Sequence, residues 1–213
     1  MSILIYWYHY QFRANLMQKF EERKFNIPDL TGISKKNVEE HLKLYAGYVK
    51  FANLALEHIE ELVKDSEKYA YELGELQRRF SFEFGGMRNH EYYFSAFEGG
   101  AKPLPDGEFK KVLAYTWGSF DLFLARFKAI ALTRGIGWAK LVYDPKDKRM
   151  LTVWLDEQHL GQLPDTRTVL ALDMWEHSYV ADYQPSGKKN YVEDFFKNLN
   201  WELIEKNFED AIK

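Results

Sequence analysis

The chain has 213 residues, enough to bury a sizeable core as one compact unit or two small domains. Hydrophobic residues make up 46% and aromatic residues 17%, as in packed globular proteins. The net charge of −3, with both signs mixed along the chain, indicates neither a nucleic-acid surface nor a basic membrane-binding face. The absence of cysteine excludes disulfides, thiolate metal sites and iron–sulfur clusters, and it fits a reducing cytoplasm.

The first ten residues are apolar, but they carry no basic leader and no small-residue cleavage site, and they are too short to cross a bilayer. We therefore interpret residues 1–24 as an N-terminal extension rather than a signal peptide, and we expect no metal role for His9.

An antiparallel helical hairpin is predicted for residues 25–98. Ser34 is a suitable N-cap, and apolar residues recur at helical spacing from there to about Leu62. A second helix is predicted over 66–79. Glycines and prolines in Glu98–Gly107 indicate a linker.

A mixed α/β domain with a three-stranded antiparallel sheet is predicted for residues 99–213. Short apolar runs predict three strands, and Pro145–Lys148 supplies a hairpin turn between the first two. The strands are expected at 137–143, 150–155 and 168–172, and the helices at 109–115, 119–133, 191–196 and 201–212. The fold class is thus α+β.

One short segment carries most of the chemistry, because Asp173-Met-Trp-Glu-His177 follows the apolar run of the third strand. A carboxylate and an imidazole four residues apart at a strand end could supply two ligands of a metal ion. The alternative is that Asp173 caps a helix and His177 is an ordinary, partly buried histidine.

Two further histidines are candidate ligands. His90 lies among aromatic residues that could form a dry shell, close to the pair Gly85 and Gly86, which allow close backbone approach. His41 lies on a predicted helix, where Tyr45 and Tyr48 follow at i+4 and i+7. At about 100° per residue these three side chains share one face.

The segments NHEYYF, GIGWAKLVYD, ALDMWEHSYVADYQ and NYVEDFFKNLNWELIEKNF occur in this order, and the sequence from about Phe25 to Phe208 resembles the iron/manganese superoxide dismutase family. The resemblance implies one iron or manganese ion per chain, held by His41, His90, Asp173 and His177, with a solvent molecule as fifth ligand. Three imidazoles and one carboxylate suit these metals better than calcium or magnesium.

The implied activity is the conversion of superoxide into oxygen and hydrogen peroxide by alternate reduction and oxidation of that ion, an antioxidant function. The alternatives are a metal-binding protein of the same fold with little or no turnover, and a different oxidoreductase using the same metal. The resemblance also implies a homodimer or a dimer of dimers. From the charge and the absence of cysteine we expect a cytoplasmic protein, with neither nucleic acid nor membrane as partner.

In the family, a Gln or His reaches the bound solvent, and the matching position after the second strand falls on His159, with Gln158 beside it. We expect His159 to be this partner, although the residues also fit a loop histidine with no such role. Trp138 and Trp175 are candidates for the aromatic shell around the ion.

The first helix departs from the family, whose gateway Tyr commonly lies eight residues after the first ligand, with a second His between them. Here Tyr48 lies seven residues after His41, and Tyr45 replaces that His. Another alignment would make Glu40 the ligand, but we prefer His41 because it shares a face with Tyr48. We expect substrate entry and proton delivery to rely on Tyr48 or Tyr45.

Two further departures concern the dimer and the sheet. Val180 replaces a second family Tyr that, in relatives, meets the missing His across the dimer interface. We therefore expect an interface that keeps a bridge from Glu176 to the neighbouring His177 and loses the Tyr/His pair. Lys140 replaces a family Trp, so we expect that face of its strand to be more solvated.

Overall fold

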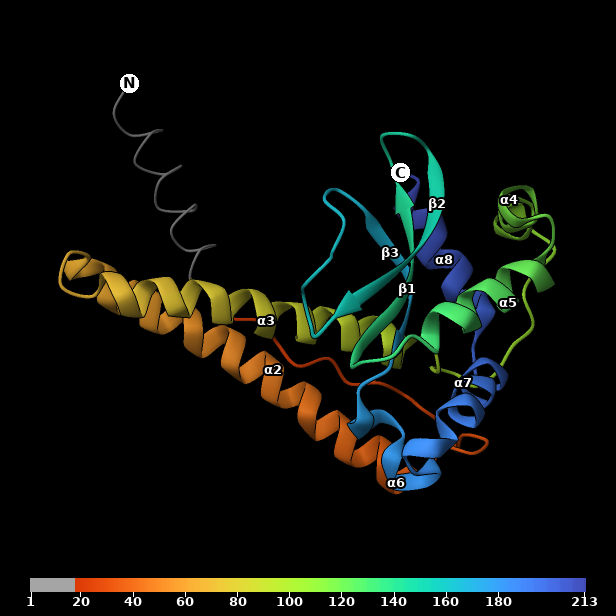
Figure 1. The fold of residues 1–213 in the computed structure, drawn as a ribbon, viewed down its shortest axis with the longest axis horizontal. Helices are drawn as coiled ribbons and strands as arrows, with labels where there is room; N and C mark the ends of the chain where they lie inside the picture. The colour runs from red at the N-terminus through yellow and green to blue at the C-terminus, as the bar shows by residue number, and fades with distance from the viewer. Residues whose placement is uncertain (1–17) are drawn as a thin grey trace.

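The computed structural model describes residues 18–213, and it has the predicted α+β architecture of a long helical hairpin followed by a three-stranded sheet with helices (Figure 1). Residues 1–17, which include His9 and most of the expected N-terminal extension, lie outside the described residues. The division at residues 24 and 98 stays a prediction.

The hairpin consists of α2 (Lys35–Leu62) and α3 (Ala70–Ser95), joined by the short 3₁₀ helix η1 (Val63–Asp65) and a turn. Ser34 caps α2 as predicted, because its side chain accepts a hydrogen bond from the backbone N–H of Asn37 at 3.1 Å. The buried side chains of α2 recur every three or four residues and face α3. Among them are His41 and Tyr45.

The helix α3 is longer than the sequence suggests. The second helix was expected to end at residue 79, but α3 runs on to Ser95 and includes Gly85, Gly86 and His90. The two glycines are buried inside the helix, where neighbouring segments come too close for a Cβ atom. They permit close packing and do not break the helix.

The sheet is three-stranded and antiparallel, as predicted, and its strand order is β2-β1-β3. Its strands are β1 (Gly137–Asp144), β2 (Arg149–Asp156) and β3 (Arg167–Asp173). The register places Trp138 of β1 directly opposite Asp173, the last residue of β3. The register therefore fixes one side of the functional site.

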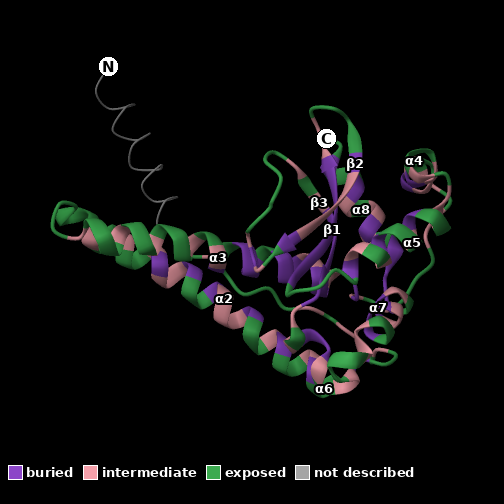
Figure 2. Ribbon diagram, in the orientation of Figure 1, coloured by how far each residue is buried: buried purple, intermediate pink, exposed green. Residues whose placement is uncertain are grey.

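Helices cover the sheet and complete the core. The helix α3 packs on β3 beside α8 (Trp201–Ala211), and α5 (Phe120–Ala131) packs on β1 and β2. Figure 2 shows buried residues concentrated where α3, the sheet and the C-terminal helices meet, while the far end of the hairpin is mostly exposed. The remaining helices are α4 (Glu108–Trp117), η2 (Glu176–Ser178), α6 (Val180–Tyr183), η3 (Pro185–Gly187) and α7 (Lys188–Lys197).

No helix within residues 18–213 combines the length and the apolar character needed to cross a membrane.

Candidate metal centre

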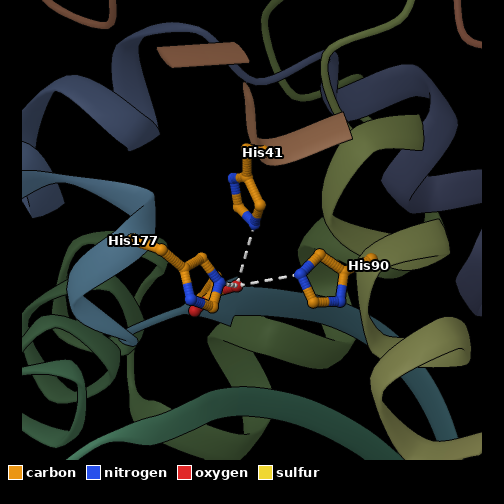
Figure 3. A group of neighbouring side chains, drawn as sticks. His41, His90 and His177 are labelled. Carbon is orange, nitrogen blue, oxygen red and sulfur yellow. Dashed lines mark hydrogen bonds and ion pairs between the residues drawn. The ribbon is translucent and has the colours of Figure 1, made fainter. Parts of the chain in front are cut away.

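Four side chains from four different elements meet at the buried junction of the hairpin and the sheet. His41 comes from α2, His90 from α3, Asp173 from the end of β3 and His177 from η2. One ligand atom from each residue lies within 4.8 Å of the others. Figure 3 shows the three imidazole rings converging from separate segments on a carboxylate oxygen. The structure thus brings together the four ligand candidates of the sequence.

Asp173 stands at the centre of this group. Its Oδ2 lies 3.1 Å from Nε2 of His41, 3.2 Å from Nε2 of His177 and 3.4 Å from Nε2 of His90. Its Oδ1 accepts a hydrogen bond of 2.8 Å from the backbone N–H of Trp175. Burial alone would raise the pKa of Asp173, but His177 and His41 outweigh it and hold that pKa well below the usual range. The carboxylate is therefore ionised at neutral pH.

The hydrogen bonds of His90 fit a metal ligand. Its Nδ1–H donates to the carbonyl oxygen of Gly86 at 2.6 Å, which leaves the lone pair on Nε2. This Nε2 is buried and has no hydrogen-bond partner among the described residues. Burial and the neighbouring His41 lower the pKa of His90 to about 3, so the imidazole is neutral and able to coordinate. An ion between the four groups would satisfy this atom.

The position of His41 decides between the two alignments of the first helix. His41 is only 2% exposed and faces Asp173, whereas Glu40 is exposed and pairs with Lys43 at 2.7 Å. Glu40 therefore does not reach the group of four. Three imidazoles with one carboxylate form a donor set suited to iron or manganese.

A chain of hydrogen bonds borders the site. Nε1–H of Trp138 donates to Oε1 of Gln158 at 2.9 Å, and this contact orients the amide. The amide Nε2 of Gln158 then donates to the hydroxyl oxygen of Tyr48, also at 2.9 Å. The rings of Tyr48 and Trp138 each lie 5.0 Å from the ring of His90. Two residues that the sequence analysis assigned to the site, Tyr48 and Trp138, are therefore linked through Gln158.

His159 does not lie in this chain of hydrogen bonds. Its ring packs edge-on against the ring of Phe82, with 5.8 Å between the ring centres. His159 also lines a cavity between α3 and the sheet with α8. The side chain bonded to Tyr48 belongs to its neighbour, Gln158, which is fully buried. His159 was preferred because its position matches that of the solvent partner in the family. Both residues lie in a turn after β2, where strand alternation no longer predicts the direction of a side chain.

The other expected site residues lie at the periphery. The hydroxyl of Tyr45 accepts from the backbone N–H of Arg23 at 2.9 Å and donates to Glu91 at 3.3 Å, so it is engaged away from the four ligands. The ring of Trp175 stacks on that of His177 at 5.9 Å. Glu176 is exposed, next to His177.

Known proteins resemble this chain over most of its length. Residues 105–207 match the model of the C-terminal domain of iron/manganese superoxide dismutases. The iron superoxide dismutase of Pyrobaculum aerophilum is 30% identical over 81% of this chain and 82% of its own length. The manganese superoxide dismutase of Mycobacterium avium is 34% identical over 82% of this chain and 84% of its own.

A third relative covers still more of the chain. The iron superoxide dismutase of Methanothermobacter thermautotrophicus is 29% identical over 92% of this chain and 100% of its own length. The relatives include both iron and manganese proteins, and the two metals share the donor set described above. The chain belongs to the iron/manganese superoxide dismutase family.

Proposed function

We propose that this protein is a superoxide dismutase, which converts two superoxide anions and two protons into oxygen and hydrogen peroxide. One iron or manganese ion per chain is held by His41, His90, Asp173 and His177. The observation that carries this proposal is the buried Nε2 of His90, which has no hydrogen-bond partner among residues 18–213 and belongs to a group whose four ligand atoms all lie within 4.8 Å of one another. When bound, the ion supplies the one-electron chemistry, by taking an electron from one superoxide and giving one to the next.

The chain's own residues hold the protons that this reaction consumes. Gln158 donates to the oxygen of Tyr48, so the hydroxyl hydrogen of Tyr48 is not used in that bond and is free to be donated into the site. Burial raises the pKa of Tyr48 well above its usual range. Tyr48 therefore keeps its proton at neutral pH and acts as a donor, oriented by Gln158 and, through it, by Trp138.

The wall of the site excludes water and fixes the ligand rings. Trp138 is fully buried, and Trp175 covers His177. The hydroxyl of Tyr191 donates to the backbone oxygen of Asp173 at 2.9 Å and so fastens the strand end that carries the carboxylate. Such supporting contacts keep the ligand atoms in place without using their lone pairs.

The test is to load the purified protein separately with iron and with manganese and to measure metal content and superoxide removal. At least one form should bind one ion per chain and remove superoxide faster than the same amount of free metal. His41→Ala should lose the ion, and Glu40→Ala should keep it, because Glu40 is exposed and paired with Lys43.

If both forms bind one ion per chain but neither removes superoxide, the proposed activity is contradicted. The alternative of a metal-binding protein with little or no turnover would then be supported. Loss of metal in Glu40→Ala but not in His41→Ala would contradict the ligand assignment.

Three finer features are also proposed. The exposed carboxylate of Glu176 lies beside His177, which supports a homodimer in which Glu176 reaches the partner's site. An antioxidant role follows from the proposed reaction. A cytoplasmic location is compatible with the absence of cysteine, and fractionation of cells producing the protein would test it.

A further inference from the structure

A cavity lies between α3 and the sheet with α8, and none of the four candidate ligands lines it. It has a volume of about 700 Å³, within the range that small-molecule sites occupy. One wall is a face of α3 that includes Phe84, Arg88 and Tyr92, and the opposite side is formed by β1, β3 and α8. The proposed dismutase reaction makes no use of this space.

Lys140 gives the cavity an uncompensated positive charge. It lines the cavity from the middle of β1 and is only 3% exposed, so the expectation of a solvated strand face was wrong. Its Nζ donates to Oδ1 of Asn89 at 3.1 Å, and no carboxylate of residues 18–213 lies within ion-pair distance of it. Residues 1–17 contain no Asp or Glu, so their side chains cannot supply a counter-charge either.

Such an arrangement is unusual for a purely structural lysine, because buried charges are normally paired. Burial lowers the pKa of Lys140 to about 8, so the side chain is still mainly protonated at neutral pH. An ammonium group has three donors, and the described contacts use one of them. Two donors therefore remain for a ligand.

Other groups around the cavity favour the same kind of ligand. Nδ1 of His159 is buried and has no hydrogen-bond partner among the described residues. Arg88 and Arg167 lie on the lining, and the one acidic lining residue, Asp210, pairs with Lys213 at 2.6 Å. The charged side chains of the lining are thus mostly basic, although Arg88 is paired with Glu91 at 2.7 Å. Other polar positions of the lining, such as Ser81 and Gln162, are uncharged. Three aromatic side chains complete it, from Phe80, Phe84 and Tyr92.

We propose that this cavity binds a small organic anion, with a carboxylate or phosphate group at Lys140 and an aromatic or apolar body against the aromatic side chains of α3. A lysine ammonium is a natural partner for either anionic group, and the aromatic walls would bury the rest of the ligand.

The site is separate from the metal centre but connected to it by one side chain. Asn89 accepts from Lys140 and donates through Nδ2 to the backbone oxygen of Gln158 at 3.0 Å. Gln158 in turn holds Tyr48. The proposal does not depend on turnover, since binding is measurable whether or not the protein removes superoxide.

The test is a calorimetric titration of the metal-loaded full-length protein with phenyl phosphate and, separately, with benzoate. Benzyl alcohol and inorganic phosphate serve as probes that lack the charge or the ring. At least one aromatic anion should bind at one per chain, and at least about tenfold more tightly than benzyl alcohol and inorganic phosphate. Comparing phenyl phosphate with benzoate distinguishes the two anionic groups.

Two variants assign the binding to this cavity. Lys140→Met should weaken binding of the preferred aromatic anion by at least about tenfold, because it removes the charge and keeps the chain length. Ser81→Trp should do the same by blocking the cavity from its exposed lining position on α3. Lys146→Met, in the exposed turn between β1 and β2, is the matched control and should bind like the unaltered protein.

Absence of binding by both aromatic anions up to millimolar concentration overturns the proposal. So does binding that is unchanged in folded Lys140→Met or Ser81→Trp, because the anion would then occupy another place, such as the metal centre. If Lys140→Met does not fold, Ser81→Trp alone decides.

Discussion

At the scale of single residues, the turn after β2 separates two adjacent side chains into different surroundings. Gln158 is fully buried between Trp138 and Tyr48. His159 instead packs on Phe82 and lines the cavity that contains Lys140. The proposed proton donation by Tyr48 would thus depend on an amide, which does not titrate. Its hydrogen-bonding role is the same across the physiological pH range.

Gln158 and His159 can be compared by substitution. Gln158→Ala should lower kcat by roughly 10- to 100-fold, because Tyr48 loses the donor that orients it. His159→Ala should leave kcat within about twofold. Superoxide removal by metal-loaded variants of equal metal content is the measurement. A larger loss in His159→Ala than in Gln158→Ala would restore His159 as the partner.

Lys140 makes a prediction about stability and pH. Its pKa is about 8 in the folded protein, against 10.5 for an ordinary lysine, so between these pH values the unfolded chain holds a proton that the folded protein has released. Stability therefore rises with pH in this window, and the penalty of the buried charge is complete below pH 8. Lys140→Met should remove this rise, which is on the order of 3 kcal/mol.

The measurement is the free energy of unfolding of both metal-loaded proteins at pH 7.5 and pH 10.5. The stability of the unaltered protein relative to Lys140→Met should increase toward pH 10.5. Lys146→Met, which is exposed, should track the unaltered protein at both pH values. A difference between Lys140→Met and the unaltered protein that does not change with pH would show that Lys140 is already neutral or solvated.

The four candidate ligands could be predicted from the sequence because each lies in a recognisable local pattern. Asp173 ends a short apolar strand, and His177 follows four residues later. His41 shares a helical face with Tyr48, and His90 lies among aromatic residues. The role of Gln158 could not be predicted, because the direction of a side chain in a turn depends on its tertiary contacts. The same holds for Lys140, whose burial results from the packing of α3 over the sheet.

At the scale of elements, α3 is the part of the fold that the sequence predicted least well. The second helix was predicted only to residue 79, yet α3 runs from Ala70 through Gly85 and Gly86 to Ser95. A Cβ at Gly86 would lie 2.5 Å from the ring of Tyr48, and one at Gly85 would overlap the backbone oxygen of Gln158. Close packing on Tyr48 and Gln158 outweighs the low helix propensity of glycine.

Gly86→Ala therefore tests whether this packing positions Tyr48. Added methyl groups normally favour a helix, but here the Tyr48 ring must move, and superoxide removal should fall by roughly 10- to 100-fold at equal metal content. Gly74→Ala is the matched control on the same helix, since nothing lies within 4 Å of its added Cβ.

Gly74→Ala should keep full activity and raise the free energy of unfolding by about 0.5–1 kcal/mol. Full activity in Gly86→Ala would mean that the position of Tyr48 in the site is not set by α3.

At the scale of the whole molecule, the group of four joins the hairpin to the sheet. Its members come from α2, α3, β3 and η2, so an ion held there ties together both parts of the chain. The overall α+β fold was predictable because helical and strand periodicities change clearly near residue 137.

Metal removal should therefore destabilise the whole protein. An ion that binds only the folded state adds about 4 kcal/mol when its concentration is a thousand times its dissociation constant. Dialysis against a chelator should lower the unfolding temperature measured by circular dichroism, and readdition of iron or manganese should restore it. His41→Ala should unfold at the same temperature with or without chelator; an equal response to the chelator there would place the ion elsewhere.

Assembly is the second prediction at this scale. If Glu176 bridges two copies, Glu176→Ala should shift the protein toward monomers in analytical ultracentrifugation, by at least about tenfold in dissociation constant. Glu209→Ala removes another exposed carboxylate, on α8, and should leave the association unchanged. An unaltered protein that is monomeric at micromolar concentration, or an equal response in both variants, would contradict the bridge.

The spacing of the ligands along the chain also sets when the centre can form. His41 and Asp173 are 132 positions apart, and Asp173 reaches its place only after β3 has paired with β1. A growing chain on the ribosome therefore lacks half of its ligands until most of it has been made. All four residues can therefore coordinate an ion only late in synthesis or after it. The ion that binds then comes from the metals available at that time.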